Sequence, residues 1–495
     1  MTELHQLSAT DSAMLFVETA NTPNHIAPLF ICDPSTLPGG GKLRLKQIRA
    51  KMEQALEGAP NFRRKLMRAP LDIDEPYWVD DPHFDLDFHL RHIALPAPGD
   101  WRQLAIQFAR LLSRPLDTNR PMWEMYVIEG LDRIDDLPPG AFAVMLKIHH
   151  SMVDGMGALA LLTGMYEFEP KLPPEPSVPK WRPEPGPNVT EIWTRGYWHA
   201  LTRPGRLAMR VGSLLPGAVR ERLSGGSEGA PIKSRAIAPK TPFNGQITPA
   251  RVFDWWRHPL AEIKTLRGLA PGSTVNDVAL AIVTGAMRRY LLAKGALPDS
   301  NLISLVPISI RSEATRDKSA GNVLSLVNLP LPTTDADPLE RLKLIAAQMA
   351  QIKNADRALS ARAIADLTSS VPGALAGMAA RAVSAIGDRS GRALATNTYV
   401  TNVPGMTVPM YFCGARIVNI GGGGPCMNNM GLVHLVGSYC EWFNVSVVGC
   451  RDLLPDIDVY MRCLDESVAE YKALLDSAPP AAPRARAKGK ARDKT

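Results

Sequence analysis

Segments with the apolar spacing of a helix alternate along this chain with short apolar runs typical of strands. Residues 104–112 have the apolar spacing of a helix, and so do Met156, Leu159, Leu162 and Tyr166. Between these segments, residues 141–148 form a short apolar run after two prolines and a glycine, which predicts a buried strand. Residues 121–131 predict another strand. We expect the second helix to run from about residue 155 to 168, so the first third of the chain mixes strands and helices.

The same alternation returns after residue 243. Thr274 suits the N-cap of a helix over 275–294, which Gly295 would end. Asp337, followed by Pro338 and then by Glu340, is a helix-start signal, and its helix should reach about residue 355. Strands are predicted over 247–255, 302–308, 398–403, 415–420 and 432–447, and further helices over 259–269 and 457–475. The pattern predicts an α/β protein in which both halves mix strands and helices.

Proline separates the two halves. Residues 169–187 contain eight prolines among nineteen residues. Because proline lacks an amide donor and fixes φ, this stretch predicts an extended connector. We therefore divide the chain into an N-terminal subdomain (1–168), a proline-rich and basic linker (169–242), a C-terminal subdomain (243–476) and a basic disordered tail (477–495).

The net charge of +7 is concentrated in two segments. Residues 201–240 carry +6 and residues 479–495 carry +5, which leaves −4 for the rest of the chain. An acidic body argues against a nucleic-acid partner, whereas basic segments beside apolar ones suit an anionic membrane or phosphates. Residues 201–223 place Arg among Leu, Met and Val. They predict either a broken amphipathic helix on a membrane or a crossover packed against the body.

Cysteine usage and the N-terminus indicate the compartment. The six cysteines show no CxxC or zinc-finger spacing, which predicts reduced, mostly buried thiols. The N-terminus lacks the basic and apolar regions of a signal peptide. No apolar run reaches the roughly 18 residues of a membrane-spanning helix. We expect a cytoplasmic protein attached peripherally to the inner membrane face or to lipid bodies.

The candidate chemistry lies in a string at the end of the buried strand, His149-His150-Ser151-Met152-Val153-Asp154-Gly155. An imidazole titrates near neutral pH, so His150 could take a proton from a hydroxyl and return it to a thiolate. His149 would point the other way if the strand persists, so we expect only one of the two to be the base. Asp154 can hold the turn. Gly155 permits a positive φ or a close approach where the helix starts.

Other interpretations of the polar and glycine-rich segments are weaker. A histidine at a strand end is often structural. A His and an Asp four residues apart can ligate a metal, but no further His or Cys cluster is apparent nearby, and we expect no metal. Ser151 is not in the Gly-x-Ser-x-Gly turn of a serine hydrolase. Gly421–Gly424 lacks the Lys and Ser/Thr of a phosphate loop, which favours a flexible turn.

Several motifs point to one family. The string resembles the HHxxxDG motif of the superfamily that contains chloramphenicol acetyltransferases, carnitine acyltransferases and nonribosomal-peptide condensation domains. Further blocks resemble the bacterial wax ester synthase/diacylglycerol acyltransferase family. In chain order, these blocks are Leu7-Ser8-Ala9-Thr10-Asp11, Arg120-Pro121-Met122-Trp123, Val275-Asn276-Asp277-Val278, Pro307-Ile308-Ser309-Ile310-Arg311, Gly321-Asn322 and Thr401-Asn402-Val403-Pro404-Gly405. HHxxxDG alone is moderately specific, whereas ordered blocks over residues 7–475 are strong.

This resemblance implies two similar chloramphenicol-acetyltransferase-like α/β subdomains, each a mixed sheet flanked by helices, with an active-site tunnel at their interface. It implies transfer of a fatty acyl group from long-chain acyl-CoA to diacylglycerol or a long-chain fatty alcohol, giving triacylglycerol or wax ester. Acyl-CoA is then a substrate, and no cofactor is needed. His150 would be the general base, without an acyl-enzyme. Asp154 would orient the loop, and Arg311 is a conceivable ion-pair partner for it.

The remaining blocks leave alternatives open. Asn276, in the first turn of a helix with Asp277, could donate to substrate or hold the tunnel, or both could serve capping and packing. Thr401 and Asn402 could supply donors to a tetrahedral oxyanion, or anchor the following turn. Trp123 is expected to shape the fold and the acceptor channel. Two other functions compete: an acyltransferase that uses a carrier-protein thioester, and a non-catalytic lipid-surface binding protein.

Overall fold

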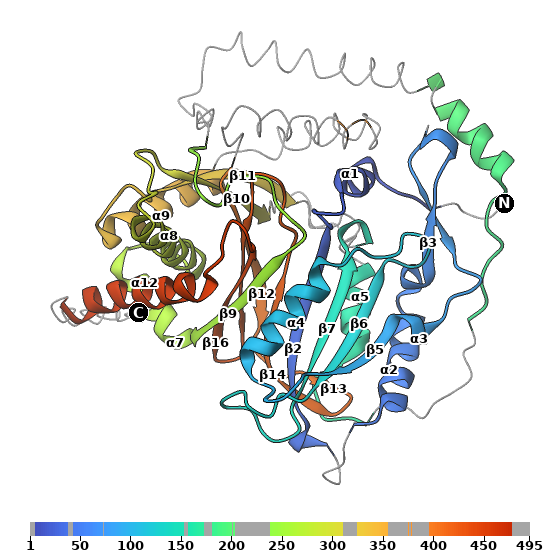
Figure 1. Ribbon diagram of the computed structural model, residues 1–495, viewed down its shortest axis with the longest axis horizontal. Helices are drawn as coiled ribbons and strands as arrows, with labels where there is room; N and C mark the ends of the chain where they lie inside the picture. The colour runs from blue at the N-terminus through green and yellow to red at the C-terminus, as the bar shows by residue number, and fades with distance from the viewer. Residues whose placement is uncertain are drawn as a thin grey trace, which may run out of the picture.

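Two mixed sheets lie side by side, each with helices on its outer face (Figure 1). The computed structural model describes residues 5–37, 43–72, 74–152, 157–172, 181–199, 201–202, 238–309, 324–354, 375, 378 and 396–477. These residues contain a seven-stranded sheet, a six-stranded sheet and a small three-stranded sheet. The predicted α/β architecture with mixed sheets in both halves is confirmed.

The seven-stranded sheet carries the HHxxxDG strand at its centre. In spatial order its strands are β5 (Leu90–Ala94), β6 (Trp123–Glu129), β7 (Phe142–His149), β2 (His25–Asp33), β14 (Ala415–Gly423), β13 (Tyr411–Phe412) and β8 (Tyr166–Glu167). Every residue of β7 is buried. Helices α2 (Leu45–Glu57) and α5 (Gly157–Met165) cover one face, and α4 (Trp101–Ser113) covers the other. Burial on both faces explains why β7 is apolar apart from Lys147 and His149, and the predicted buried strand is confirmed.

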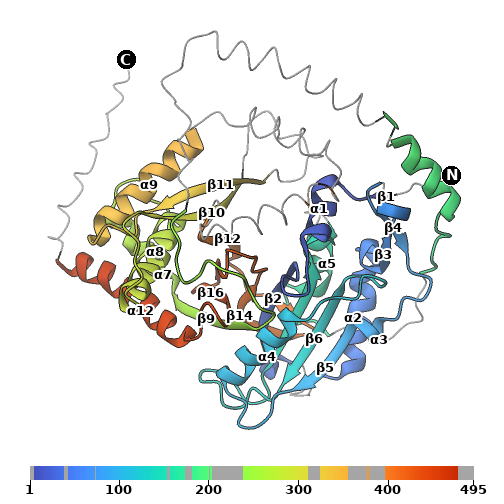
Figure 2. The same cartoon turned by 45° about the horizontal axis from the view of Figure 1, so that its top comes forward.

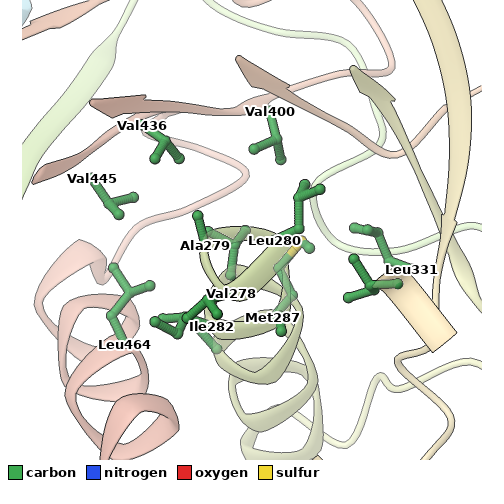
Figure 3. Close-up of a cluster of buried hydrophobic side chains, with 14 of the residues drawn as sticks. Val278, Ala279, Leu280, Ile282, Met287, Leu331, Val400, Val436, Val445 and Leu464 are labelled. Carbon is green, nitrogen blue, oxygen red and sulfur yellow. The ribbon is translucent and has the colours of Figure 1, made fainter. Parts of the chain in front are cut away.

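The six-stranded sheet belongs to the second half. Its strands are β11 (Leu324–Leu331), β10 (Leu302–Ser309), β12 (Thr398–Met406), β15 (Leu432–Tyr439), β16 (Trp442–Cys450) and β9 (Arg251–Pro259). Its outer helices are α7 (Leu260–Leu266), α8 (Val275–Ala293), α9 (Pro338–Asn354) and α12 (Ile457–Ser477). Figure 3 shows Val278, Ala279 and Ile282 of α8 between strand residues and Leu464 of α12. This core supports the sheet from outside.

The predicted N-caps of helices α8 and α9 are confirmed. Thr274 caps α8 by accepting from the Asp277 amide, and Gly295 follows at φ 62°. Asp337 accepts from the Leu339 amide at 2.8 Å at the start of α9. The strand predicted over 247–255 instead runs from Arg251 to Pro259, because it ends where its partner β16 begins. Pairing with a distant strand fixes that boundary.

The two sheets meet at β14, which comes from the second half but pairs with β2 of the first. The flexible turn predicted at Gly421–Gly424 is wrong for Gly421–Gly423, which lie inside this strand. A Cβ on Gly421 would lie 2.9 Å from the Trp255 ring, and one on Gly423 would lie 2.8 Å from Leu112 Cδ2. The glycines therefore let β14 fit between α4 and the six-stranded sheet.

Replacing Gly423 with alanine is expected to lower the free energy of unfolding by about 1–3 kcal/mol, because the added methyl must displace Leu112 and Phe108. Gly424→Ala is the matched control, since its nearest neighbour, Leu435 Cδ1, would be 3.7 Å away. Urea unfolding of both variants measures the difference. Equal stabilities would contradict this account of the glycine run.

The small sheet and the helix over residues 189–199 and 201–202 lie on the outer side of the first half (Figure 1). The sheet consists of β1 (His5–Gln6), β4 (Tyr77–Asp80) and β3 (Arg64–Met67). Residues 181–188 have no regular secondary structure, and residues 189–199 and 201–202 are helical, which the proline pattern did not predict. The predictions for residues 203–223 and for the tail after residue 477 lie outside the described residues.

Candidate functional site

His150 lies where β7 ends, in the 3₁₀ turn His150–Met152. Its backbone N–H donates to the Asn24 carbonyl at 2.8 Å, just before β2 begins. Helix α1 (Ala9–Val17) packs against the same turn, and Figure 2 shows it at this end of the sheet. The predicted base therefore lies at the junction of β7, β2 and α1.

The surroundings of His150 favour its neutral form. Burial lowers the pKa of His150, the neighbouring His149 lowers it further, and Asp11 on α1 raises it. The net shift is downward from the ordinary value. A lowered pKa leaves the imidazole deprotonated at neutral pH, which is the state that a general base requires.

The ring of His149 is buried, and its two nitrogens form hydrogen bonds with Glu18 and Ser151. Its Nε2 lies 2.6 Å from Oε2 of Glu18, the residue that follows α1. Its Nδ1 lies 2.7 Å from the Ser151 hydroxyl and accepts from the Ser151 amide at 3.2 Å. An amide can only donate, so Nδ1 has no proton and Nε2 donates to Glu18. These bonds place His149 in the framework beside His150.

Further titratable side chains extend this group along the sheet. His25 pairs with His149 in register, and burial lowers the pKa of His25 well below its ordinary value. Lys147, two residues before His149, is fully buried, and burial lowers its pKa to about 8. Its Nζ donates to the Arg114 carbonyl at 2.5 Å and lies 3.7 Å from Glu124 Oε2. The carbonyls at the end of α4 favour this cation.

Two predicted residues of the second half contact each other. The Asn402 amide donates to Asn276 Oδ1 at 3.0 Å, joining β12 to the first turn of α8. Asp277 is buried, and its Oδ2 accepts from the amide and the hydroxyl of Thr274, both at 2.8 Å. Of the two interpretations of this block, helix capping therefore describes Asp277. Thr401 makes a side-chain hydrogen bond with Tyr399 that lowers the Tyr399 pKa against the larger effect of burial.

Trp123 lies in the core of the first half. It pairs in register with Ile148, so it faces away from His149. Its indole Nε1 donates to the Phe62 carbonyl at 2.7 Å, and its ring stacks on His89 with centroids 4.6 Å apart. These contacts give Trp123 a packing role.

Asp154, Gly155 and Arg311 lie outside the described residues, as does the Gly321-Asn322 block. Their roles stay predictions. In the part of the chain that the structure does describe, no group of three His, Cys, Asp or Glu side chains could hold a metal ion.

The structure adds residues that the sequence did not single out: Glu18, Asn24 and His25. Glu18 and His149 are 131 positions apart, so no local spacing connects them. The only signal in the sequence is a polar residue at the start of the apolar run His25–Asp33.

The family model described as the wax ester synthase/diacylglycerol acyltransferase catalytic domain matches residues 7–279, and the WS/DGAT C-terminal domain matches residues 320–472. The chain belongs to the wax ester synthase/diacylglycerol acyltransferase family. As a member of the WS/DGAT family it is an acyltransferase, and the predicted resemblance is confirmed.

Relatives from Mycobacterium tuberculosis resemble this WS/DGAT chain over nearly its full length. Rv1760 and Rv3087 are each named as candidate diacylglycerol O-acyltransferases. Rv1760 is 34% identical over 477 residues, covering 96% of this chain and 92% of the relative. Rv3087 is 32% identical over 461 residues, covering 90% and 92%.

Solved structures show the same fold. The wax ester synthase/diacylglycerol acyltransferase from Marinobacter aquaeolei VT8 superposes with a TM-score of 0.64 at 24% identity, covering 95% of this chain and 100% of that chain. The TRI3 trichothecene 15-O-acetyltransferase from Fusarium sporotrichioides gives 0.57 at 10% identity, covering 94% and 95%. These likenesses support the predicted fold class of the WS/DGAT chain.

Proposed function

We propose that this protein transfers a long-chain fatty acyl group from acyl-CoA to diacylglycerol or to a long-chain alcohol. The products are triacylglycerol or wax ester, and free CoA. The observation that carries the proposal is His150, a half-buried imidazole with a lowered pKa on a turn that is fixed by β2 and α1. It lies in the half that matches the family's catalytic domain.

In the proposed reaction His150 acts on the acceptor. It takes the proton of the acceptor hydroxyl while that oxygen attacks the thioester carbon. The tetrahedral intermediate then collapses, the C–S bond breaks, and the proton passes from His150 to the CoA sulfur. Asn276 accepts from Asn402 through its Oδ1, so the group that it can offer to an oxyanion is its Nδ2 amide.

Burial of Ser151 and of most cysteines supports direct transfer without an acyl-enzyme. The Ser151 hydroxyl lies 2.7 Å from His149 Nδ1, but Ser151 is buried and so is shielded from a substrate. All six cysteines are free, and five are buried, as expected for reduced thiols. Burial raises the pKa of Cys426 to about 12 and that of Cys463 to about 11, which keeps these thiols protonated and poorly nucleophilic.

A donor and acceptor panel tests the proposed reaction. Purified protein is given radiolabelled palmitoyl-CoA, or a palmitoylated carrier protein, with dioleoylglycerol or hexadecanol. We expect labelled triacylglycerol or wax ester from palmitoyl-CoA, in amounts equal to the CoA released. Transfer from the carrier protein alone would favour a condensation-type enzyme. No transfer from either donor would favour the non-catalytic lipid-surface protein.

We also propose that the helix over residues 189–199 and 201–202 contacts a lipid surface. Its inner side is anchored, because Ile192 packs on Ala69 and Tyr77, and His199 lies 2.7 Å from Asp74. Its outer side exposes Trp193, Tyr197, Trp198 and Leu201. Figure 1 shows this green helix at the outer edge of the first half.

The chemistry of this helix suits an anionic lipid surface. Trp and Tyr favour the boundary between headgroups and acyl chains. The chain continues from this helix into the basic segment 201–240. None of the helices in the described ranges combines the length and apolar character needed to cross a bilayer. The exposed aromatic side chains of this helix fit contact with a lipid surface from one side.

Replacing Trp193 and Trp198 together with alanine is expected to weaken binding to phosphatidylglycerol-containing vesicles by about ten-fold or more, since burying each indole contributes more than 1 kcal/mol. Vesicle co-sedimentation measures the change. Phe168→Ala is the control, because that side chain is 61% exposed, comparable to 66% for Trp198, but lies before the linker. Equal losses in both variants would argue against a specific lipid-contacting helix.

A further inference from the structure

We propose that Glu18 is a positioning residue for His150 and that it acts through the ring of His149. This inference rests on the proposed function, because it gives Glu18 a part in the same acyl transfer. Glu18 ends α1, and its Oε2 lies 2.6 Å from His149 Nε2. The carboxylate therefore ties the helix to the end of the catalytic strand.

Glu18 selects one tautomer of His149. A carboxylate accepts hydrogen bonds, so it favours the tautomer with the proton on Nε2. That tautomer leaves a lone pair on Nδ1, which accepts from the Ser151 amide at 3.2 Å. In the opposite tautomer the ring N–H on Nδ1 could donate to the Ser151 hydroxyl, 2.7 Å away, but the Ser151 amide would lose its acceptor. Since His149 and Ser151 are both buried, water cannot take the place of either partner.

The consequence reaches His150 through its backbone. The backbone N–H of His150 donates to the Asn24 carbonyl. The backbone N–H of Ser151, the next residue, donates to Nδ1 of His149. Both peptide units that flank the imidazole are therefore held. The second of these bonds depends on the tautomer that Glu18 selects. Without Glu18, the Ser151 amide loses its acceptor and the turn that orients His150 loosens.

His149, rather than His25, is the partner of Glu18. His25 Nδ1 lies 3.5 Å from the Leu112 carbonyl, and a carbonyl can only accept, so the His25 proton is on Nδ1. His25 Nε2 then presents a lone pair to Glu18 Oε1, 3.8 Å away, and has no hydrogen-bond partner. The carboxylate has a donor in His149 and none in His25.

Direct electrostatic action of Glu18 on His150 is not needed. Glu18 bonds to the ring of His149, and the shift in the pKa of His150 comes mainly from burial and from His149. A positioning role therefore predicts a loss of kcat with little change in the pH at which His150 titrates.

The test compares Glu18→Ala with Glu18→Gln. The alanine variant removes the acceptor, and we expect kcat with palmitoyl-CoA to fall about 10- to 100-fold while KM changes less than about two-fold. The glutamine variant keeps a carbonyl acceptor at the same reach and should recover most of the activity. Glu53→Ala is the matched control, because Glu53 is 17% exposed against 18% for Glu18 and pairs with a buried arginine elsewhere.

Amide exchange provides a readout that does not depend on activity. Hydrogen–deuterium exchange of the peptide that covers residues 149–152 should be faster in Glu18→Ala than in the wild type, and unchanged in Glu53→Ala. Wild-type kcat in Glu18→Ala, equal defects in the alanine and glutamine variants, or unchanged exchange would each overturn the inference. A wild-type protein without acyl transfer would instead overturn the proposed function, while faster exchange would still support the structural link from Glu18 to this turn.

Discussion

Replacing His150 with alanine is expected to lower kcat for acyl transfer by about 10²- to 10⁴-fold, the usual contribution of a positioned base. The variant loses the group that accepts the hydroxyl proton. Its backbone bond to Asn24 does not depend on the side chain, so the turn should survive. CoA release from palmitoyl-CoA measures the loss, and thermal unfolding checks that the protein is folded.

His92→Ala is the control for this variant. His92 is a partly exposed imidazole that pairs with Glu129 at 3.2 Å on β5, and its removal should leave kcat within about two-fold of the wild-type value. The pH profile gives a second readout. Because the pKa of His150 is lowered, the active neutral form persists as pH falls, and kcat/KM should decline only below about pH 6.5. Undiminished turnover in His150→Ala would refute the proposed mechanism.

Replacing Trp123 with alanine is expected to lower the free energy of unfolding by about 3–5 kcal/mol. The indole is fully buried between Phe62 and His89, and its removal also leaves the Phe62 carbonyl without its donor. Urea unfolding of the purified variant measures the loss. A loss of this size is the result expected from the packing contacts of Trp123.

Two matched variants separate these contributions. Trp123→Phe keeps most of the packing and loses the N–H, so it should cost only about 1–3 kcal/mol. Trp198→Ala removes an exposed indole and should change stability by less than about 0.5 kcal/mol. A stable Trp123→Ala variant with a raised KM for the acceptor would show instead that this residue lines the channel.

Local signals predicted those parts of the fold that local contacts determine. The apolar run of β7 and the caps of α8 and α9 are short-range features, and the structure confirms them. The placement of β14 is not short-range, because Gly421 pairs with Leu29 of the other half. By itself a run of four glycines predicts a turn, and only its contacts with distant residues make it part of a strand. The prolines of residues 169–187 likewise predict an extended chain, and they give no sign of the helix that begins at residue 189.

The site shows the same division. The HHxxxDG string singled out His150 because strand end, imidazole and glycine are adjacent in the sequence. The residues that hold its turn, Glu18 and Asn24, come from the beginning of the chain and meet it only through the pairing of β2 with β7. No spacing in the sequence encodes that contact. The roles of Asp154 and Arg311 stay predictions.

The most direct test is a crystal structure of the wild-type protein with a non-hydrolysable thioether analogue of palmitoyl-CoA and hexadecanol. The account predicts a ring nitrogen of His150 at about 2.6–3.2 Å from the alcohol oxygen. That oxygen should face the carbon that replaces the thioester carbonyl. An alcohol bound with its oxygen remote from His150, or a His150 ring that packing separates from both ligands, would contradict the account.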